Sequence, residues 1–411
     1  MTAEYDVIVV GARCAGATTA MLLARKGYRV LAVDRATFPS DTVSTHMVQA
    51  PGVALLEQWG LLDAVVAAGT PPIEKYTFDF GFPSGSVRIA GTARMPDGFC
   101  TAYAPRRTIL DKILVDAAVA AGAEVRENFT VDSLAFEDGR VVGINGHRAR
   151  GGPVTERARL VVGADGRDSK VAKAVAAHQY NDHPKGQYQY YSYWRNLPTD
   201  GFEVVIRPSR VWAAQPTNDE LTMLVVAWPI TERHAFRADI EGNYLRTLDL
   251  APEFAQRVRA ATRVEPFVGA AVANYFRKPY GPGWALVGDA AYNKDPITAL
   301  GITDAFQCAE LLTGAIDETF GGATTFDDAM AAYQRARDER YTAVYEHTAH
   351  MAQLEPASAD FERLIRAMRG NQEAIDAFAG INAGIVSPLD FFDQANIDRI
   401  LGNDIMARAR H

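Results

Sequence analysis

Residues 284–312, WALVGDAAYNKDPITALGITDAFQCAELL, contain the pattern that decides the fold. The apolar run at 284–287 predicts a buried strand, and Gly288-Asp289 puts a close backbone approach and a carboxylate at its end. Pro296 suits the first position of a helix, whose free N–H groups carry partial positive charge. A strand, a carboxylate and a helix N-terminus in this order suit a polyol-linked, electron-rich ring such as a flavin.

The beginning of the chain has the pattern of a βαβ unit. Strands are predicted at 5–10 and 29–33, with a helix at 17–26 between them. Gly11 and Gly16 stand where a dinucleotide-binding turn has its first and third glycines, which permit the tight turn and close helix packing. The pattern predicts a nucleotide-binding turn.

Three charged residues belong to this turn and its strand. Arg13 replaces the second glycine, so the motif is degenerate, and its side chain either reaches the pyrophosphate or points to solvent beside it. Asp34 ends the second strand, where a carboxylate binds a ribose hydroxyl, and an aspartate there favours an unphosphorylated ribose. Arg35 follows directly and is assigned to the same nucleotide site.

The rest of the chain divides by composition. Residues 1–175 and 277–320 are predicted to form one nucleotide-binding domain. Residues 176–276 are predicted to form an inserted, mostly antiparallel sheet, because polar and apolar residues alternate there and aromatic residues are enriched. Residues 321–411 are predicted to be helical, with a long amphipathic helix at 326–351. Shorter predicted elements are helices at 51–68 and 108–121, a strand at 124–136 and a hairpin turn at 137–140.

Composition argues against several classes of protein. A net charge of −8 argues against a nucleic-acid partner. Three cysteines do not form a disulfide framework, which favours a reducing compartment. The N-terminus lacks the basic segment of a signal peptide, and no apolar run approaches the roughly 18 residues of a membrane span. We therefore expect a soluble cytoplasmic protein with no transmembrane segment, and no metal because no metal-binding motif is present.

Three separated motifs carry a family resemblance. They are VIVVGARCAGA at 7–17, LVVGADGRDSKVA at 160–172 and WALVGDAAYNKDPITALGITDA at 284–305, with a weaker fourth, RRTILDKIL, at 106–114. Their combination resembles the FAD-dependent monooxygenases of the aromatic-hydroxylase type (group A), a superfamily that includes geranylgeranyl-reductase-like oxidoreductases. The resemblance implies an α/β protein: a Rossmann-like FAD-binding domain, an inserted mostly antiparallel β-sheet substrate domain and a helical C-terminal region.

The cofactor site follows from these motifs. The residues predicted to hold FAD are Gly11, Arg13, Gly16, Asp34, Arg35, Arg107, Asp165, Gly166, Gly288, Asp289, Pro296, Gly301 and Ile302. The resemblance implies that Asp289 binds the ribitol chain and that Arg107 contacts the polar arm of the cofactor. It also implies that Asp165 and its glycine support both FAD and the site for a nicotinamide reductant. The segment from Pro296 to Ile302 is implied to lie beside the isoalloxazine ring, where a helix N-terminus stabilises negative charge.

Catalytic and substrate residues are less well marked. His46, Pro296, Gly301 and Ile302 are the predicted catalytic residues, and His46 is either a polar group of the active site or a loop histidine bonded to backbone. Tyr188, Tyr190, Tyr191 and Tyr193 either line a substrate pocket or form sheet core and surface. Residues 292–295 depart from the histidine-containing loop of aromatic hydroxylases, which affects the expected substrate more than the cofactor.

Two possible functions follow from the resemblance, and a third is kept as a non-enzymatic alternative. In the first, NADH or NADPH reduces FAD, O₂ adds at the flavin C4a position, and the hydroperoxide hydroxylates an aromatic or polyketide-like small molecule. In the second, the protein is a flavin-dependent reductase or dehydrogenase acting on C=C bonds. In the third, it binds flavin without catalysis. A halogenase is disfavoured because the Trp-x-Trp-x-Ile-Pro signature is absent.

Overall fold

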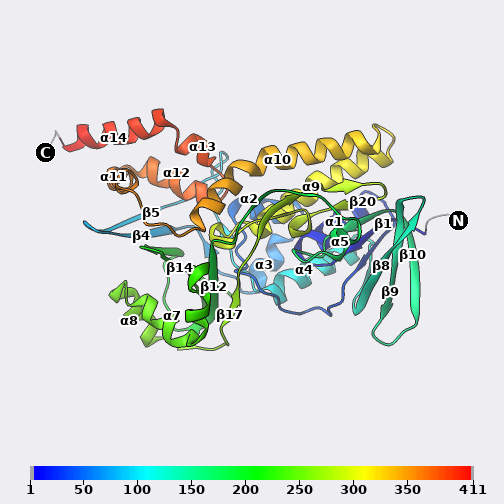
Figure 1. Ribbon diagram of the computed structural model, residues 1–411, viewed down its shortest axis with the longest axis horizontal. Coiled ribbons are helices and arrows are strands. Elements are labelled where there is room, and N and C mark those ends of the chain that lie inside the picture. The colour runs from blue at the N-terminus through cyan, green and yellow to red at the C-terminus, as the bar shows by residue number, and fades with distance from the viewer. Residues whose placement is uncertain (1–3, 409–411) are drawn as a thin grey trace.

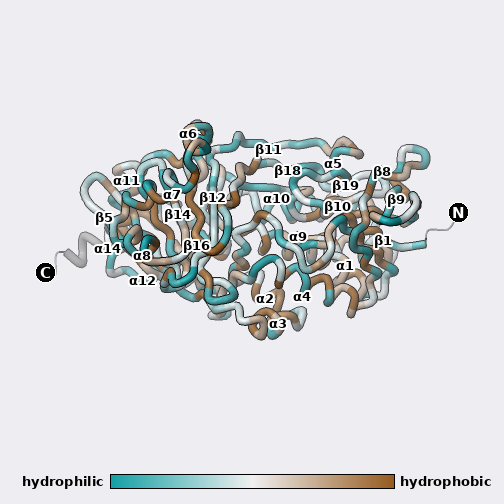
Figure 2. The backbone as a smooth tube through the Cα atoms, turned by 90° about the horizontal axis from the view of Figure 1, so that it is seen from below, coloured by the Kyte–Doolittle hydropathy of each residue, from teal (hydrophilic) through white to brown (hydrophobic). Residues whose placement is uncertain are grey.

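The computed structural model describes residues 4–408 and places two β-sheets toward opposite ends of an elongated molecule (Figure 1). The first sheet lies near the N-terminus and the second near the C-terminal helices, and Figure 2 shows the same separation from below. Helix α10 (Phe326–Met351) runs between the two ends, with the bounds predicted from its sequence. The protein is therefore of mixed α/β class, as predicted.

The first sheet brings the three sequence motifs together. Its strand order is β19-β20-β10-β1-β2-β7, and neighbouring strands from β20 to β7 are parallel. Its strands are β1 (Tyr5–Val10), β2 (Val30–Val33), β7 (Glu124–Arg126), β10 (Pro153–Gly163), β19 (Tyr280–Gly281) and β20 (Trp284–Leu286). Because the carboxyl ends of parallel strands meet at one edge, the turns after β1, β10 and β20 lie side by side.

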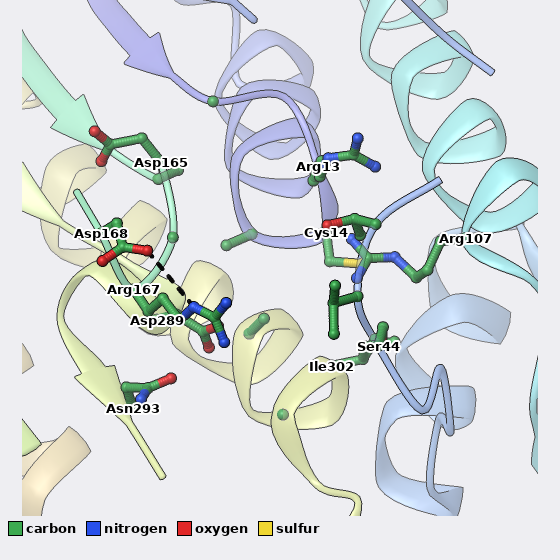
Figure 3. A pocket seen from close by; sticks show the side chains of 18 of the residues that line it. Arg13, Cys14, Ser44, Arg107, Asp165, Arg167, Asp168, Asp289, Asn293 and Ile302 are labelled. Atoms are coloured by element: carbon green, nitrogen blue, oxygen red, sulfur yellow. Dashed lines mark ion pairs between the residues drawn. The ribbon is translucent and has the colours of Figure 1, made fainter. Parts of the chain in front are cut away.

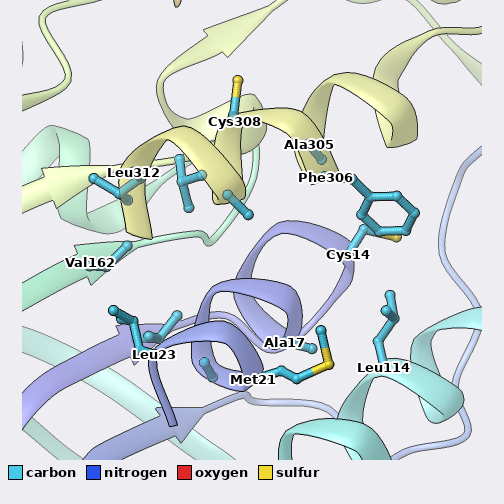
Figure 4. Packing of buried hydrophobic residues seen from close by; sticks show 14 of the residues in the cluster. Cys14, Ala17, Met21, Leu23, Leu114, Val162, Ala305, Phe306, Cys308 and Leu312 are labelled. Atoms are coloured by element: carbon cyan, nitrogen blue, oxygen red, sulfur yellow. The ribbon is translucent and has the colours of Figure 1, made fainter. Parts of the chain in front are cut away.

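Helices cover one face of this sheet. Helix α1 (Cys14–Arg25) packs against α4 (Arg107–Ala120) and α9 (Gly301–Phe320). Figure 4 shows Met21 of α1 among Leu114 of α4 and Phe306 of α9, and all three are fully buried. Burying such a side chain stabilises the fold by roughly 1.5–3 kcal/mol. The opposite face is covered by the hairpin of β8 (Phe129–Glu137) and β9 (Arg140–Arg148), with α5 (Lys170–Ala174) beside it.

The second sheet is wider than the predicted insertion. Its order is β16-β12-β15-β14-β13-β4-β5, so two strands from before residue 176 belong to it, and β4 pairs with β13 in parallel. Its strands are β4 (Tyr76–Phe82), β5 (Gly85–Gly91), β12 (Gln187–Arg195), β13 (Phe202–Arg207), β14 (Arg210–Pro216), β15 (Leu221–Pro229) and β16 (Thr262–Arg263), with β17 (Val268–Ala270) beside β12. The proposed domain boundary at 176 therefore does not describe this sheet.

Further elements complete the two ends. A small antiparallel sheet consists of β11 (Gln179–His183), β18 (Asn274–Arg277) and β21 (Tyr292–Asn293). The remaining elements are α2 (Ala50–Gln58), α3 (Leu62–Ala67), β3 (Pro72–Ile73), β6 (Ala102–Tyr103), η1 (Ile230–Glu232), α6 (Arg233–Arg237), α7 (Ile240–Leu248), α8 (Pro252–Ala260), η2 (Gly288–Ala290), η3 (Pro296–Thr298), α11 (Ala359–Ala367), α12 (Gln372–Asn382), α13 (Pro388–Phe391) and α14 (Gln394–Arg408). Among residues 4–408, no helix is both long and apolar enough to cross a membrane.

Three local predictions are wrong. Pro296 opens a single 3₁₀ turn, not α9: Ala299 adopts a left-handed conformation with φ 52°, which interrupts the helical hydrogen bonds, and α9 begins at Gly301. The predicted helix at 51–68 is two helices, because Gly60 has φ 75° and ends the first. The predicted strand at 124–136 is likewise divided, into β7 and β8.

Candidate active site and FAD cavity

The three motif turns open onto one cavity of about 550 Å³. This volume lies within the range of sites for cofactors and drug-sized ligands. The predicted site residues that line it are Gly11, Arg13, Asp34, Arg35, His46, Arg107, Asp165, Gly166, Tyr191, Asp289, Pro296, Gly301 and Ile302. Gly16, Gly288, Tyr188, Tyr190 and Tyr193 are not part of this lining. Residues from distant parts of the sequence therefore share one site (Figure 3).

The turn after β1 depends on its glycines. Gly11 has φ +98°, and a Cβ there would lie 2.5 Å from the carbonyl oxygen of Ala164. A Cβ on Gly16 would lie 1.8 Å from the carbonyl oxygen of Gly11. Such contacts are impossible for any other residue, so the glycines let β1, β10 and the first turn of α1 approach each other. This is the close backbone packing expected of a dinucleotide-binding turn.

Asp34 is held rigidly at the end of β2. Its Oδ2 accepts a hydrogen bond from the backbone N–H of Ala12, and its Oδ1 accepts one from Ala36, each at 2.8 Å. The carboxylate therefore joins the end of β2 to the fingerprint turn and faces the cavity with lone pairs to spare. This geometry fits the predicted ribose contact, and the adjacent Arg35 is exposed at the same wall.

Arg13 and Arg107 share a buried carboxylate that the sequence analysis missed. The Nε and Nη2 atoms of Arg107 each donate to Asp111 at 3.0 Å, and Nη1 of Arg13 donates to Asp111 at 2.5 Å. Asp111 is fully buried, and Cys14 donates its thiol to the same carboxylate at 3.3 Å. The guanidinium of Arg13 also lies 5.4 Å from the ring of Phe38. Asp111 thus fixes two cations in the cavity wall, and its spacing of four residues from Arg107 on α4 was the available signal.

Asp165 accepts hydrogen bonds from residues of its own sequence motif. Its carboxylate accepts hydrogen bonds from Ser169 Oγ at 2.5 Å and from the N–H groups of Lys170 at 2.6 Å and Val171 at 3.2 Å. These bonds cap the N-terminus of α5. Burial nonetheless raises the pKa of Asp165 above its usual value. Gly166 has φ +76° and lies beside it, so a direct contact between either residue and FAD stays a prediction.

Asp289 is a carboxylate without a donor. It lies in η2 directly after β20, its side chain is exposed toward the cavity, and among residues 4–408 no protein donor forms a hydrogen bond with its carboxylate. Protein surrounds it on the other sides, and this desolvation raises the pKa of Asp289 although Arg107 opposes the shift. Gly288 has φ +60°, and a Cβ there would lie 2.7 Å from the Cβ of Ala15. The hydroxyl groups of the predicted ribitol chain could donate hydrogen bonds to this carboxylate.

The start of α9 is open toward the cavity. Gly301 is exposed, and a Cβ at this position would meet nothing within 4 Å, so the backbone borders free space. Ile302 and Pro296 line the same wall, and the 20 residues of α9 give its first N–H groups partial positive charge. A flat ring that becomes negative on reduction fits this surface, so the residues present suit FAD.

A buried ion pair lies behind this segment and was not predicted. Nζ of Lys294 contacts Oδ2 of Asp304 on α9, and it donates to the hydroxyl of Tyr292 at 3.0 Å. The two charged residues are 7% and 6% exposed. A second cavity of about 20 Å³ lies between this pair and Asp289, which is room for one water molecule. The segment that departs from the histidine-containing loop thus carries its own buried cation.

The four tyrosines of β12 lie in pairs on its two opposite faces. Tyr188 and Tyr190 pack among aromatic residues beneath the helices that follow β15, and Tyr190 stacks on Phe236 with centroids 5.2 Å apart. Tyr191 and Tyr193 lie on the other face. The hydroxyl of Tyr191 accepts a hydrogen bond from the backbone of Ser44 at 3.3 Å, and Tyr191 lines the cavity. The sequence could not fix this phase, because both faces are apolar enough to be buried.

His46 both lines the cavity and forms a hydrogen bond with the backbone. It is 1% exposed with φ 43°, and its Nδ1 forms a hydrogen bond with the carbonyl of Ala104 at 3.0 Å, so Nδ1 carries the proton. Its ring stacks on Tyr193 at 5.7 Å, and it lines the cavity. Burial lowers the pKa of His46 to about 3, which keeps the ring neutral. A histidine with this pKa is a poor general base near neutral pH.

Comparison with known proteins agrees with this geometry. The model of the FAD binding domain family matches residues 4–348, which is most of the chain. The chain belongs to this FAD-binding family. It is therefore an FAD-dependent oxidoreductase, in a superfamily whose members include monooxygenases, halogenases and geranylgeranyl reductases.

The alignments with curated relatives extend over most of this chain. The chain is 28% identical to a digeranylgeranylglycerophospholipid reductase of Methanopyrus kandleri, over 86% of this chain and 91% of the relative. It is 26% identical to the 6-methylpretetramide 4-monooxygenase of Streptomyces rimosus, over 83% of each.

Solved structures share the fold. A flavin-dependent brominase superposes with a TM-score of 0.81 at 18% identity, and the match covers 99% of each chain. A flavoprotein/dehydrogenase from Cytophaga hutchinsonii superposes with a TM-score of 0.82 at 17% identity, covering 98% of this chain and 100% of the other. At these identities the likeness extends to the fold alone.

Proposed function

We propose that this protein is a monooxygenase that uses NADH or NADPH and O₂ to hydroxylate an aromatic or polyketide-like small molecule. The observation that carries the proposal is the continuity of the cavity. It extends from Asp34 and Arg107 at the polar arm, past Asp289, to a compartment beneath β12 that contains Gln189 and Tyr191. The residues assigned to the cofactor and the compartment proposed for the substrate thus belong to one cavity.

The residues of the chain bind and orient in this proposal. FAD, when bound, supplies the transfer of electrons from the reductant to O₂ and the transfer of oxygen to the substrate. Asp289 accepts hydrogen bonds from the ribitol hydroxyls, and Arg107 faces the phosphates. The backbone at Gly301 holds partial positive charge beside the ring and favours its anionic reduced form.

The substrate end of the cavity supports a polar aromatic ligand. Its walls include the amides of Gln189 and Asn293 and the phenol of Tyr191, together with the apolar Ala270 and Val272. Aromatic and apolar walls with a few polar groups fix the orientation of a ring that carries hydroxyl or carbonyl groups. The relative that acts on 6-methylpretetramide has a substrate of this kind in its name.

A second candidate is a reductase of C=C bonds. It is supported by the relative at 28% identity that is named a digeranylgeranylglycerophospholipid reductase. The amide-rich wall formed by Gln189 and Asn293 favours the first candidate, because a long isoprenoid chain gains nothing from buried amides.

The two candidates differ in the fate of oxygen. The purified holoenzyme is mixed with NADH or NADPH and a panel of phenols and polyketide-like aromatics under ¹⁸O₂. The monooxygenase consumes O₂ with substrate and places one labelled atom in the product. A reductase yields a reduced product that carries no ¹⁸O, and it forms this product without consuming O₂. FAD that neither nucleotide reduces, with any candidate substrate present, would favour a flavin-binding protein without catalysis.

A further inference from the structure

Asp295 and Gln187 meet where the second sheet contacts the segment leading to α9. Asp295 lines the cavity and caps η3, because its Oδ1 accepts a hydrogen bond from the N–H of Ile297 at 3.0 Å. The same oxygen accepts a hydrogen bond from Nε2 of Gln187, the first residue of β12. Both side chains are 1% exposed, so neither has water as an alternative partner.

Each of these side chains has a second oxygen with no partner. Among residues 4–408, Oδ2 of Asp295 and Oε1 of Gln187 form no hydrogen bond. If Asp295 were ionised, its Oδ2 and the Oε1 of Gln187 would both be buried acceptors without a donor. Buried polar groups are nearly always paired. A single proton on Oδ2 would resolve both deficits, because a hydroxyl there could donate to Oε1.

We propose that, on the acidic side of neutral pH, Asp295 is a neutral carboxylic acid in the folded protein and forms a cyclic pair of hydrogen bonds with the amide of Gln187. In this pair, Nε2–H donates to Oδ1 and the hydroxyl at Oδ2 donates to Oε1. Asp295 is then a positioning residue. It fastens β12, which carries Gln189 and Tyr191 into the cavity, to the segment that contains Pro296.

The packing around Asp295 supplies no cation. Burial raises the pKa of Asp295 to about 7, opposed by its hydrogen bonds from Gln187 and Ile297. From β12 it is faced by the uncharged Gln187. From β18 it is faced by Asn274, whose Oδ1 accepts the backbone N–H of Asp295 at 2.6 Å.

Charged groups nearby are already paired or lie elsewhere on the wall. Lys294 precedes Asp295 in the chain, but its ammonium group contacts Asp304 of α9. Asp289 lies on the same cavity wall and cannot stabilise a second negative charge. From α10, the hydroxyl of Thr348 reaches this region at 3.3 Å from that of Thr298. The environment therefore favours the neutral acid.

The positioning role rests on the proposed function, since it requires the compartment beneath β12 to hold substrate. The protonation state does not, because it is measured without turnover. Infrared difference spectra of the oxidised holoenzyme are recorded from about pH 5 to about pH 9. A protonated carboxyl has a C=O stretching band that a carboxylate lacks and that shifts in D₂O. We expect the wild type to lose such a band with a midpoint near 7, and Asp295→Asn to lack it throughout.

Two variants test the partner. Gln187→Leu removes the amide and should move both the band and its midpoint. Gln189→Leu is the matched control, because Gln189 lies two residues along β12, lines the cavity and is not among the hydrogen-bond partners of Asp295 within residues 4–408, and its spectrum should match the wild type. Absence of the band at the acidic end, or equal shifts in both variants, overturns the proposal.

Asp295→Asn also tests the positioning role. Asparagine can make both hydrogen bonds with Gln187 and does not titrate, so the variant should fold and retain FAD. With an accepted substrate, the wild type should show KM rising as the pH passes 7, and Asp295→Asn should show a KM that does not change there. Identical pH profiles would refute positioning by the acid. If no substrate is oxygenated at all, the proposed function fails while the infrared result still decides the protonation state.

Discussion

Arg107 and Asp111 form a two-point ion pair across one turn of α4, in the wall of the FAD cavity. The pair is buried, and Asp111 also holds Arg13 from the fingerprint turn. A guanidinium with both ends fixed presents its remaining N–H groups in one orientation, which suits a phosphate. The arrangement couples the position of α4 to that of α1 and thereby shapes the end of the cavity where we propose that the phosphates bind.

Removing the shared carboxylate should therefore be costly. Asp111→Asn leaves two arginines with one carbonyl oxygen, and we expect the free energy of unfolding to fall by about 3–5 kcal/mol. The matched control is Asp116→Asn, because Lys112 and Asp116 have the same spacing on α4 but are exposed. That variant should change stability by less than about 1 kcal/mol. Chemical denaturation compares the two, and equal losses would show that burial of the Arg107 pair is unimportant.

Asp289→Ala should weaken FAD binding and leave the fold intact. The variant loses a charge-assisted hydrogen bond of roughly 1.5–3 kcal/mol, which corresponds to a loss of affinity of about 10- to 150-fold. Asp168→Ala is the control, since Asp168 lies at the same cavity but its carboxylate is already paired with Arg167 at 3.6 Å. Dialysis followed by flavin fluorescence measures the retained cofactor. Retention equal to that of the parent protein would contradict the role of Asp289.

Substitutions on the two faces of β12 should have different effects. Tyr191→Ala should lower kcat/KM by an amount equivalent to about 1–3 kcal/mol with FAD content unchanged, because Tyr191 lines the proposed substrate compartment. Tyr190→Ala should instead lower stability by about 3 kcal/mol, because Tyr190 packs against Trp228 and Phe236. Steady-state kinetics and thermal unfolding separate the two effects. Loss of FAD in Tyr191→Ala would place the substrate elsewhere.

The grouping of the motif turns around one cavity was predictable because the sequence signals are local. The turn at Gly11 and the carboxylate at Asp289 each follow an apolar strand directly, and parallel strands bring such turns to one edge. Helix α10 was predictable because its length and periodicity leave no alternative. By contrast, the break after Pro296 depends on the left-handed conformation of Ala299, for which alanine gives no signal.

The tertiary partners could not be predicted in the same way. Lys294 and Asp304 pair across the turn η3, and their separation in sequence matches no regular element. The inward face of β12 depends on which side the helices after β15 cover, and residue alternation is the same for either choice. Asp111 differs, because its spacing from Arg107 on a predicted helix was a usable signal.

His46 should make the protein less stable in acid. The pKa of His46 is lowered from 6.5 in the unfolded chain to about 3 in the folded protein, because the ring is buried. The unfolded state therefore binds a proton more readily below 6.5, so the stability contributed by the neutral ring is present above that pH and is lost as the pH falls toward 3. His46→Gln should show a shallower loss of thermal stability over this range. His147→Gln is the control, because His147 is exposed beside Asp132, and its acid profile should follow the parent. A His46→Gln profile parallel to that of the wild type would mean that the buried imidazole is not neutral, and the assignment of its proton to Nδ1 alone would be wrong.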